Sequence, residues 1–104
     1  MGIAQGATPY VMLFVEGYDL RDAEGIMLVI KTQEKALFFD RERVTVTGDG
    51  NESLVMVHLT QQETLSISPG RADTQLRWRD GNNESYTSDA LPLEVRTSIY
   101  KGVV

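Results

Sequence analysis

Two predicted strands joined by a very short crossing segment, between Leu54 and Asp80, constrain this chain most strongly. In Leu54–Leu59 and again in Thr74–Arg79, core-type side chains alternate with others, and successive side chains of a strand point to opposite faces of a sheet. Each strand therefore offers one face to a core. The residues predicted to face that core are Val55, Val57, Leu59, Thr74, Leu76 and Trp78.

The segment between the two strands fits a helix start. In a capping box, the Thr60 hydroxyl accepts a hydrogen bond from the amide of Glu63, and the Glu63 carboxylate accepts one from the amide of Thr60. Pro69 and Gly70 follow so soon that the helix can hardly exceed one turn. The sequence therefore predicts a one-turn helix that carries the chain from one sheet to the other.

Turn chemistry divides the rest of the chain into short strands. Gly48–Asn51 and Asp80–Asn83 are rich in Gly, Asp and Asn, which tolerate the positive φ of tight hairpins. Residues 1–8 are predicted to be a mobile N-terminus and residues 9–104 a single domain. The further strands are predicted over Tyr10–Glu16, Ala36–Asp40, Val44–Thr47, Glu84–Ser88 and Leu93–Ile99.

The segment Leu20–Lys31 permits two interpretations. Apolar residues recur there at helical spacing after Asp19, which could cap a helix. Gly25 and the unbroken apolar run Ile26–Ile30 favour instead a strand buried on both faces. With this strand, the chain has seven or eight short strands separated by regular turn signals, which predicts an all-β antiparallel β-sandwich.

Composition excludes several classes of function. A chain of 104 residues is normally one domain, and its net charge of −5 gives no general attraction to nucleic acid or anionic lipid. It contains no cysteine, so disulfides, thiolate nucleophiles and cysteine-based zinc sites are excluded. No apolar run approaches the ~20 residues that cross a bilayer. No nucleic-acid or membrane partner is predicted, and the start of the chain, which lacks the basic residues of a secretory signal, favours synthesis in a cytosol.

Motifs that could carry chemistry are incomplete. His58 is the single histidine and is predicted to lie on the outer face of its strand, without an acid and a nucleophile around it. Asp49–Asn51 and Asp80–Asn82 begin like calcium loops, but the glycine at the sixth position and the glutamate at the twelfth are missing in both. Hairpin turns explain both stretches.

Charged clusters are interpreted as solvated surface. Acids gather in Asp19–Glu24 and in Asp40–Glu42, as in any acidic soluble domain. Arg77 and Arg79 flank Trp78, but strand alternation sends the ring to the opposite face, so a stacking platform for bases is not predicted. These arginines, and Arg71 nearby, are expected to pair with acids on a neighbouring strand or another subunit if they act at all. The sequence therefore predicts no catalytic, cofactor-binding or metal-ligating residue and no enzymatic activity.

Several stretches resemble a known family. Leu59–Leu65, Gly70, Gln75–Trp78, Asp80–Gly81 and the closing Val95 with Ile99–Val103 are similar to small phage and prophage structural proteins, in particular to the N-terminal domain of upper baseplate proteins of tailed phages. The resemblance implies an Ig-like β-sandwich, no enzymatic activity, and a place in the tail or baseplate of a virion. It further implies a protein that is present in the bacterial cytoplasm during assembly and then in the virion, with other tail or baseplate proteins as partners. A homo-oligomer is compatible with that role.

An alternative hypothesis is a small β-sandwich module that binds a host-surface saccharide or another ligand. Such a module needs exposed aromatic side chains on its loops. The candidates are Tyr18, Tyr86 and Tyr100.

Overall fold

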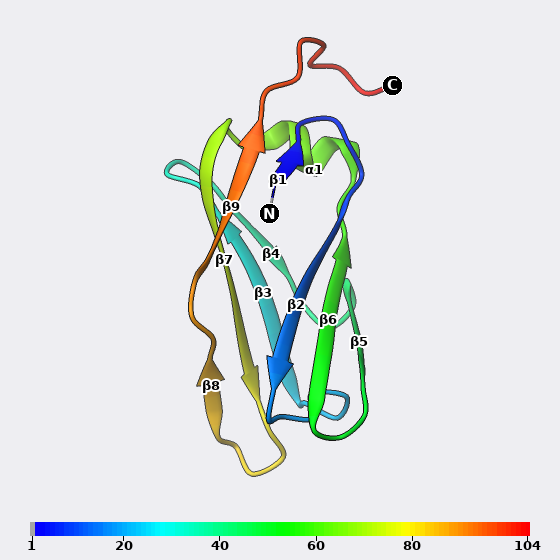
Figure 1. Cartoon of the computed structure of the whole chain (residues 1–104), viewed down its shortest axis with the longest axis vertical. Coiled ribbons are helices and arrows are strands. Elements are labelled where there is room, and N and C mark those ends of the chain that lie inside the picture. The colour runs from blue at the N-terminus through cyan, green and yellow to red at the C-terminus, as the bar shows by residue number, and fades with distance from the viewer. Residues whose placement is uncertain (1) are drawn as a thin grey trace.

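In the computed structural model, which describes residues 2–104, two β-sheets enclose one apolar core, and a short helix closes one end (Figure 1). The strands are β1 (Gly2–Ala4), β2 (Tyr10–Glu16), β3 (Gly25–Lys31), β4 (Ala36–Phe39), β5 (Val44–Gly48), β6 (Glu52–His58), β7 (Gly70–Arg79), β8 (Ser85–Thr87) and β9 (Leu91–Arg96), and the helix is α1 (Gln61–Ser66).

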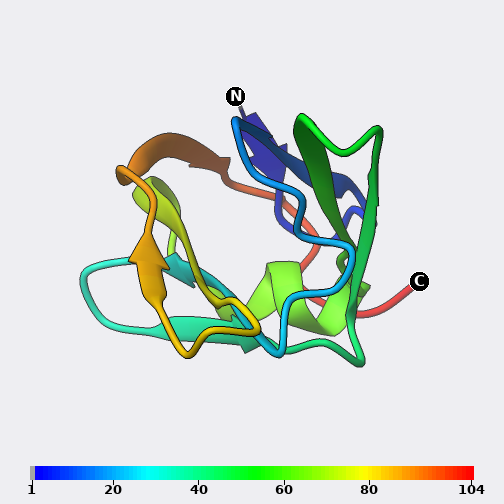
Figure 2. The same ribbon diagram turned by 90° about the horizontal axis from the view of Figure 1, so that it is seen from below.

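The strand order is that of an Ig-like β-sandwich. One sheet has the order β1-β9-β7-β3-β4, with β8 also paired to β7, and the other has the order β2-β6-β5. If β2, β3, β4, β5, β6, β7 and β9 are named B, C, C′, D, E, F and G, the two sheets have the B-E-D and G-F-C-C′ strand orders of a variable-type domain. Viewed along the strands, the two sheets lie on opposite sides of the core (Figure 2). The predicted all-β, Ig-like class is confirmed.

The core consists of the alternate residues that the sequence pattern predicted. Leu76 is fully buried and Trp78 is 6% exposed, whereas Arg77 and Arg79 between and beside them are exposed. Facing them from β6, Val55 and the neighbouring Val57 are buried as well. The predicted alternation in both strands is therefore confirmed.

Helix α1 begins at a complete capping box. The Thr60 hydroxyl accepts from the Glu63 amide at 3.1 Å, and the Glu63 carboxylate accepts from the Thr60 amide at 2.9 Å. That carboxylate also holds Arg43, at the start of β5, through two hydrogen bonds of 2.8 and 2.9 Å. The helix is six residues long, somewhat longer than the single turn predicted, and it ends before Pro69 and Gly70. Because Arg43 and Thr60 both favour the ionised carboxylate, they lower the pKa of Glu63.

A first prediction concerns this carboxylate. Glu63→Gln should lower the free energy of unfolding at neutral pH by about 0.5–1 kcal/mol, because glutamine can still accept from the Thr60 amide but cannot form the ion pair with Arg43. A carboxyl group whose pKa is lower in the folded than in the unfolded chain contributes stability that is lost as pH falls through the folded pKa. Urea unfolding at neutral pH and in acid should therefore show a difference that shrinks in acid. Glu42→Gln serves as an exposed control, and a difference that does not depend on pH would contradict the prediction.

The ambiguous segment from Leu20 to Lys31 is a loop followed by a strand. Only Gly25–Lys31 is extended, and it pairs with β4 on one side and β7 on the other. Leu20 lies in the preceding loop, where its side chain is buried and its amide donates to the hydroxyl of Ser53 on β6 at 2.8 Å. Leu20 is therefore a loop residue whose side chain lies in the core, and not part of a helix. The apolar run is a strand as predicted, but it is buried on one face only, and Met27 and Val29 on the other face are half-buried.

The segment predicted to be a mobile terminus, residues 1–8, contains a strand that pairs with the domain, and residue 1 lies outside the described residues. Gly2–Ala4 form β1, which pairs parallel with β9 in the register Ile3 to Val95. The Ile3 side chain is buried, and the buried Gln5 amide group donates to the carbonyl oxygen of Ile67 at 2.8 Å. One buried apolar side chain and these hydrogen bonds attach the segment to the sandwich, so the domain begins before residue 9.

The last strand also differs from its prediction, Leu93–Ile99. Strand β9 begins at Leu91 and ends at Arg96, and Ile99 is fully exposed. Pro92 lies beyond the residues of β9 that pair with β1, so β9 is at the edge of the sheet there. A proline is tolerated at an edge position because its missing N–H costs little. Likewise β7 begins at Gly70 rather than at Thr74, because its first residues pair with β9.

Candidate interaction surfaces

The single histidine lies on the surface, as predicted. His58 is exposed at the end of β6, its ring stacks on Tyr10 with centroids 4.2 Å apart, and its Nε2 lies 3.0 Å from the carbonyl oxygen of Thr8. The nearby groups are therefore an aromatic ring and a backbone oxygen, which orient the imidazole and do not activate it as a base.

The calcium-like stretches are hairpin turns. Asp49 accepts from the amides of Asn51 and Glu52, and Asp80 accepts from the amides of Asn82 and Glu84. Each carboxylate is thus engaged by its own turn. Within residues 2–104, no three acidic or histidine side chains gather where they could hold a metal ion.

In both acidic loops, an aspartate side chain accepts hydrogen bonds from a residue of the same loop. Asp19 accepts from the backbone and the guanidinium of Arg21, and these hydrogen bonds hold the pKa of Asp19 at about 2. Asp40 accepts from the amide of Glu42. The structure does not place carboxylates of these loops together as an acid and base pair.

Arg71 pairs with Asp73 on the surface of β7, with 3.2 Å between the charged atoms. Arg77 and Arg79 form no ion pair within the described residues 2–104. They line a groove of about 530 Å³ with the outward side chains of β3 and the exposed Phe38 on β4. Arg71 thus pairs with an acid of its own strand, and among the described residues none of the three arginines forms the predicted ion pair with an acid on a neighbouring strand.

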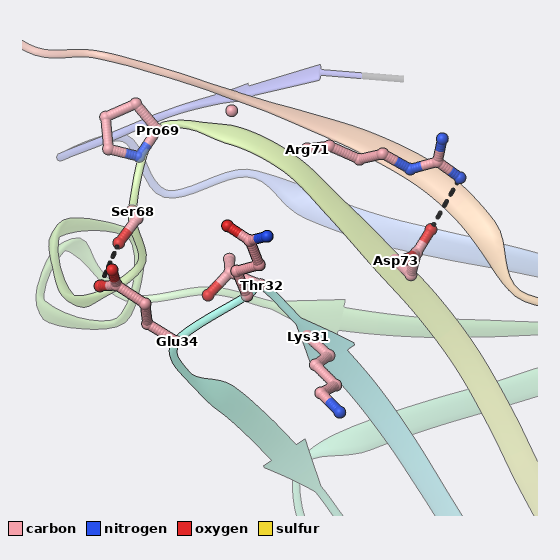
Figure 3. Close-up of a pocket in the computed structure, with 9 residues that line it drawn as sticks. Lys31, Thr32, Glu34, Ser68, Pro69, Arg71 and Asp73 are labelled. Carbon is pink, nitrogen blue, oxygen red and sulfur yellow. Dashed lines mark hydrogen bonds and ion pairs between the residues drawn. The ribbon is translucent and has the colours of Figure 1, made fainter.

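A polar pocket of about 780 Å³ lies between the β3–β4 turn and the start of β7 (Figure 3). Two pairs of its polar side chains interact: the Ser68 hydroxyl donates to Glu34 at 3.4 Å, and Arg71 pairs with Asp73. The pocket contains neither an aromatic ring nor a histidine. Its lining does not assemble groups for acid–base or nucleophilic chemistry.

Two of the three tyrosines considered for a saccharide site lie together, with the ring centroids of Tyr18 and Tyr86 5.0 Å apart. Tyr18 and Tyr86 both pack on Trp78 at the end of the sandwich where the β7–β8 hairpin turns, with ring centroids 5.3 and 5.5 Å from the tryptophan. Burial by these neighbours, with help from the charge on Asp80, raises the pKa of Tyr86. Tyr100 belongs to the segment after β9, and Figure 1 shows this segment at the opposite end of the sandwich. Tyr18, Tyr86 and Trp78 line a small pocket of about 160 Å³, to which the third candidate does not contribute.

The outer face of the three-stranded sheet is unusually apolar. Tyr10, Met12 and Phe14 on β2 are 59%, 48% and 57% exposed, although they alternate with buried residues. Their register places them opposite residues of β6 that share the same outer face. We call this surface the β2 face, and it consists of Tyr10, Met12, Phe14, Leu54, Met56 and His58.

This surface could not be foreseen as functional from local patterning. The run Val11–Val15 is apolar at every position, so the sequence alone does not say which residues face out. Pairing with β6, whose buried residues alternate with less buried ones in the structure, fixes the two faces. Contiguous apolar patches are rarely exposed on monomeric proteins. Where they occur, they often mark contact sites for other macromolecules.

Comparisons with known proteins do not identify a family for this chain. No family model matches the chain, and no curated protein matches it. Among solved structures, the chain is similar to one described as murine CRIg, with 9% sequence identity and a TM-score of 0.38 over 94% of this chain and 91% of that chain. A likeness of this size carries no argument about function. The resemblance to phage structural proteins therefore stays a prediction. Among residues 2–104, no helix is long and apolar enough to cross a membrane.

Proposed function

We propose that the chain is a non-enzymatic structural protein of a phage or prophage particle, of the tail or baseplate type, that acts through protein–protein contacts. The observation that carries this proposal is the β2 face, on which two aromatic side chains and a methionine of one strand are about half exposed. The resemblance of the sequence to phage structural proteins supplies the biological setting. On this proposal the chain is made in the bacterial cytoplasm and enters the virion with other tail or baseplate proteins.

The chemistry of the β2 face fits a protein partner. Its aromatic and sulfur-containing side chains are the types enriched in the buried centres of protein interfaces. The face lies on a sheet, whereas small-molecule sites are concave. With a net charge of −5, the chain has no general electrostatic attraction to nucleic acid.

The proposal is tested by asking whether the chain enters particles through this face. In a bacterium that carries the gene, particles released after prophage induction are purified, and the tagged chain is measured in them. We expect the wild-type chain to be present and the double variant Met12→Lys with Phe14→Lys to be reduced at least about tenfold, because each lysine would have to be desolvated in the contact.

The matched control is Thr45→Lys with Thr47→Lys. These residues of β5 are exposed on the same side of the sheet, opposite Met56 and Leu54 of β6 but away from β2. The control should enter particles like the wild type, and all variants should melt at similar temperatures. Absence of the wild-type chain from purified particles would contradict the proposed function.

A further inference from the structure

We propose that two copies of this chain associate by antiparallel pairing of their β2 strands, which joins the two three-stranded sheets into one. The inference rests on the proposed function, since it names a second copy as a partner of the β2 side. It goes beyond that function because it assigns the contact to the edge of the strand and fixes its register.

The outer edge of β2 is open. Within residues 2–104, β2 pairs with β6 on one side and with no strand on the other. The carbonyl oxygen of Pro9 accepts from the amide of Leu59 at 2.9 Å, and the amide of Gly17 donates to the carbonyl oxygen of Asn51 at 2.7 Å. These two pairs have the same register as β2 and β6, and both involve odd-numbered residues of the segment.

Hydrogen-bonded and non-hydrogen-bonded pairs alternate along an antiparallel ladder. The odd-numbered residues of β2 therefore direct their N–H and C=O groups toward β6. The even-numbered residues direct theirs to the open edge. Those residues are Tyr10, Met12, Phe14 and Glu16.

The edge lacks the usual protection against pairing. Natural edge strands are short, bulged, or carry lysine or proline. Strand β2 has seven residues, no proline, and Glu16 as its only charge. The other edges are shorter, with four residues in β4, five in β5 and three in β1. Among the described strands, β2 therefore offers the longest open ladder.

One register uses the whole strand. With a two-fold axis at Leu13, Met12 lies opposite the partner's Phe14 and Tyr10 opposite the partner's Glu16. All of these residues direct their backbone groups outward, so this register satisfies the open edge of both copies. On the outer face, a methionine then contacts an aromatic ring, and a tyrosine hydroxyl can donate to a carboxylate. The strand is thus complementary to itself in the antiparallel direction.

Charge favours the same direction. Within one copy, Glu16 lies opposite Glu52 at one end of the two strands, and Tyr10 lies opposite His58 at the other. Antiparallel pairing brings the acidic end of each copy beside the Tyr10–His58 end of the other. Parallel pairing would gather four carboxylates at one end, where like charges repel.

The first test is the oligomeric state, measured by sedimentation equilibrium over a wide concentration range. We expect the wild type to be a dimer and Met12→Pro to raise the dimer dissociation constant at least about tenfold, because proline removes an outward N–H and blocks the ladder. That N–H forms no bond to β6, so the domain itself loses no hydrogen bond. Met56→Lys, which changes the same face on β6 but not the edge, should leave the dimer in place.

The second test reads the register and also decides the matter if Met12→Pro fails to fold. Because the chain has no cysteine, single Met12→Cys and Phe14→Cys variants, made with tags of different size, can be mixed and oxidised. The proposed register predicts that the mixed disulfide dominates over either homodimer. A matched mixture of Thr45→Cys and Thr47→Cys should give no such preference.

Failure of this inference is distinguishable from failure of the proposed function. A wild type that stays monomeric at all concentrations, or a dimer lost in Met56→Lys but retained in Met12→Pro, would overturn edge pairing. Neither result bears on whether the chain enters particles through the β2 face, which the particle assay measures separately.

Discussion

Trp78→Ala is expected to lower the free energy of unfolding by about 3–5 kcal/mol, the usual cost of removing a large aromatic side chain from a core. The ring is 6% exposed and contacts both Tyr18 and Tyr86, so its removal leaves a cavity lined by two other rings. Since a domain of this size is stable by only ~5–15 kcal/mol, the variant should unfold at much lower urea concentration.

The measurement is urea unfolding followed by far-UV circular dichroism, because the variant lacks the fluorescent ring. Arg77→Ala changes the neighbouring residue that points outward and should alter stability by no more than about 0.5 kcal/mol. In the wild type, Trp78 is the only tryptophan, and its emission should lie well to the blue of free tryptophan. Emission like that of the free amino acid would contradict the buried position.

Ser53→Ala is expected to cost about 1–3 kcal/mol although it removes a single oxygen, since a buried group left unpaired, here the Leu20 amide, costs ~1–3 kcal/mol. The Ser53 hydroxyl is fully buried, accepts from the amide of Leu20 at 2.8 Å and donates to the carbonyl oxygen of Tyr18 at 2.9 Å. It thereby holds the β2–β3 loop against β6.

Thermal and urea unfolding of Ser53→Ala should be compared with Ser68→Ala, whose hydroxyl makes only a long bond to Glu34 and whose loss should cost no more than about 0.5 kcal/mol. Hydrogen exchange should also show faster exchange of the Leu20 amide. Equal stability of the two serine variants would mean that water replaces the lost hydroxyl in the loop.

Much of the fold could be predicted because its signals are local. The capping box at Thr60, the hairpin turns, and the alternation around Trp78 each depend on residues within a few positions of one another. Such patterns act through the backbone and a single face, and they are therefore visible in the sequence. The strand Gly25–Lys31 is likewise predicted by local features, namely Gly25 and the unbroken apolar run that follows it.

The parts that the sequence did not predict depend on distant partners. Strand β1 is three residues long and is extended because it pairs with β9, and nothing in Gly2–Ala4 itself requires a strand. Similarly, β8 and β9 both pair with β7 along one edge. Between them, the amide of Ser88 donates to the carbonyl oxygen of Leu76, and its hydroxyl accepts from the Leu76 amide. This double attachment is a property of the assembled sheet.

The candidate surface was hidden for a related reason. The residues that stand out in the sequence are those that carry chemistry, namely His58, the acids and the arginines. The structure engages most of these in local hydrogen bonds and exposes instead apolar residues of β2. The residue type alone does not tell whether an apolar side chain of β2 faces water or the core. Only the pairing of β2 with β6 distinguishes the two.

The parallel pairing of β1 with β9 has a consequence for biosynthesis. Strand β1 is the first strand of the sandwich to be synthesised, and its partner β9 is the last. Strand β1 therefore cannot form its pairing until β9 has left the ribosome. Until then Ile3 has no strand beside it, and the nascent domain is incomplete at one corner. Closure of this contact joins segments from opposite ends of the domain, a kind of contact that slows folding. The sandwich is therefore expected to reach its native state only after β9 has been synthesised.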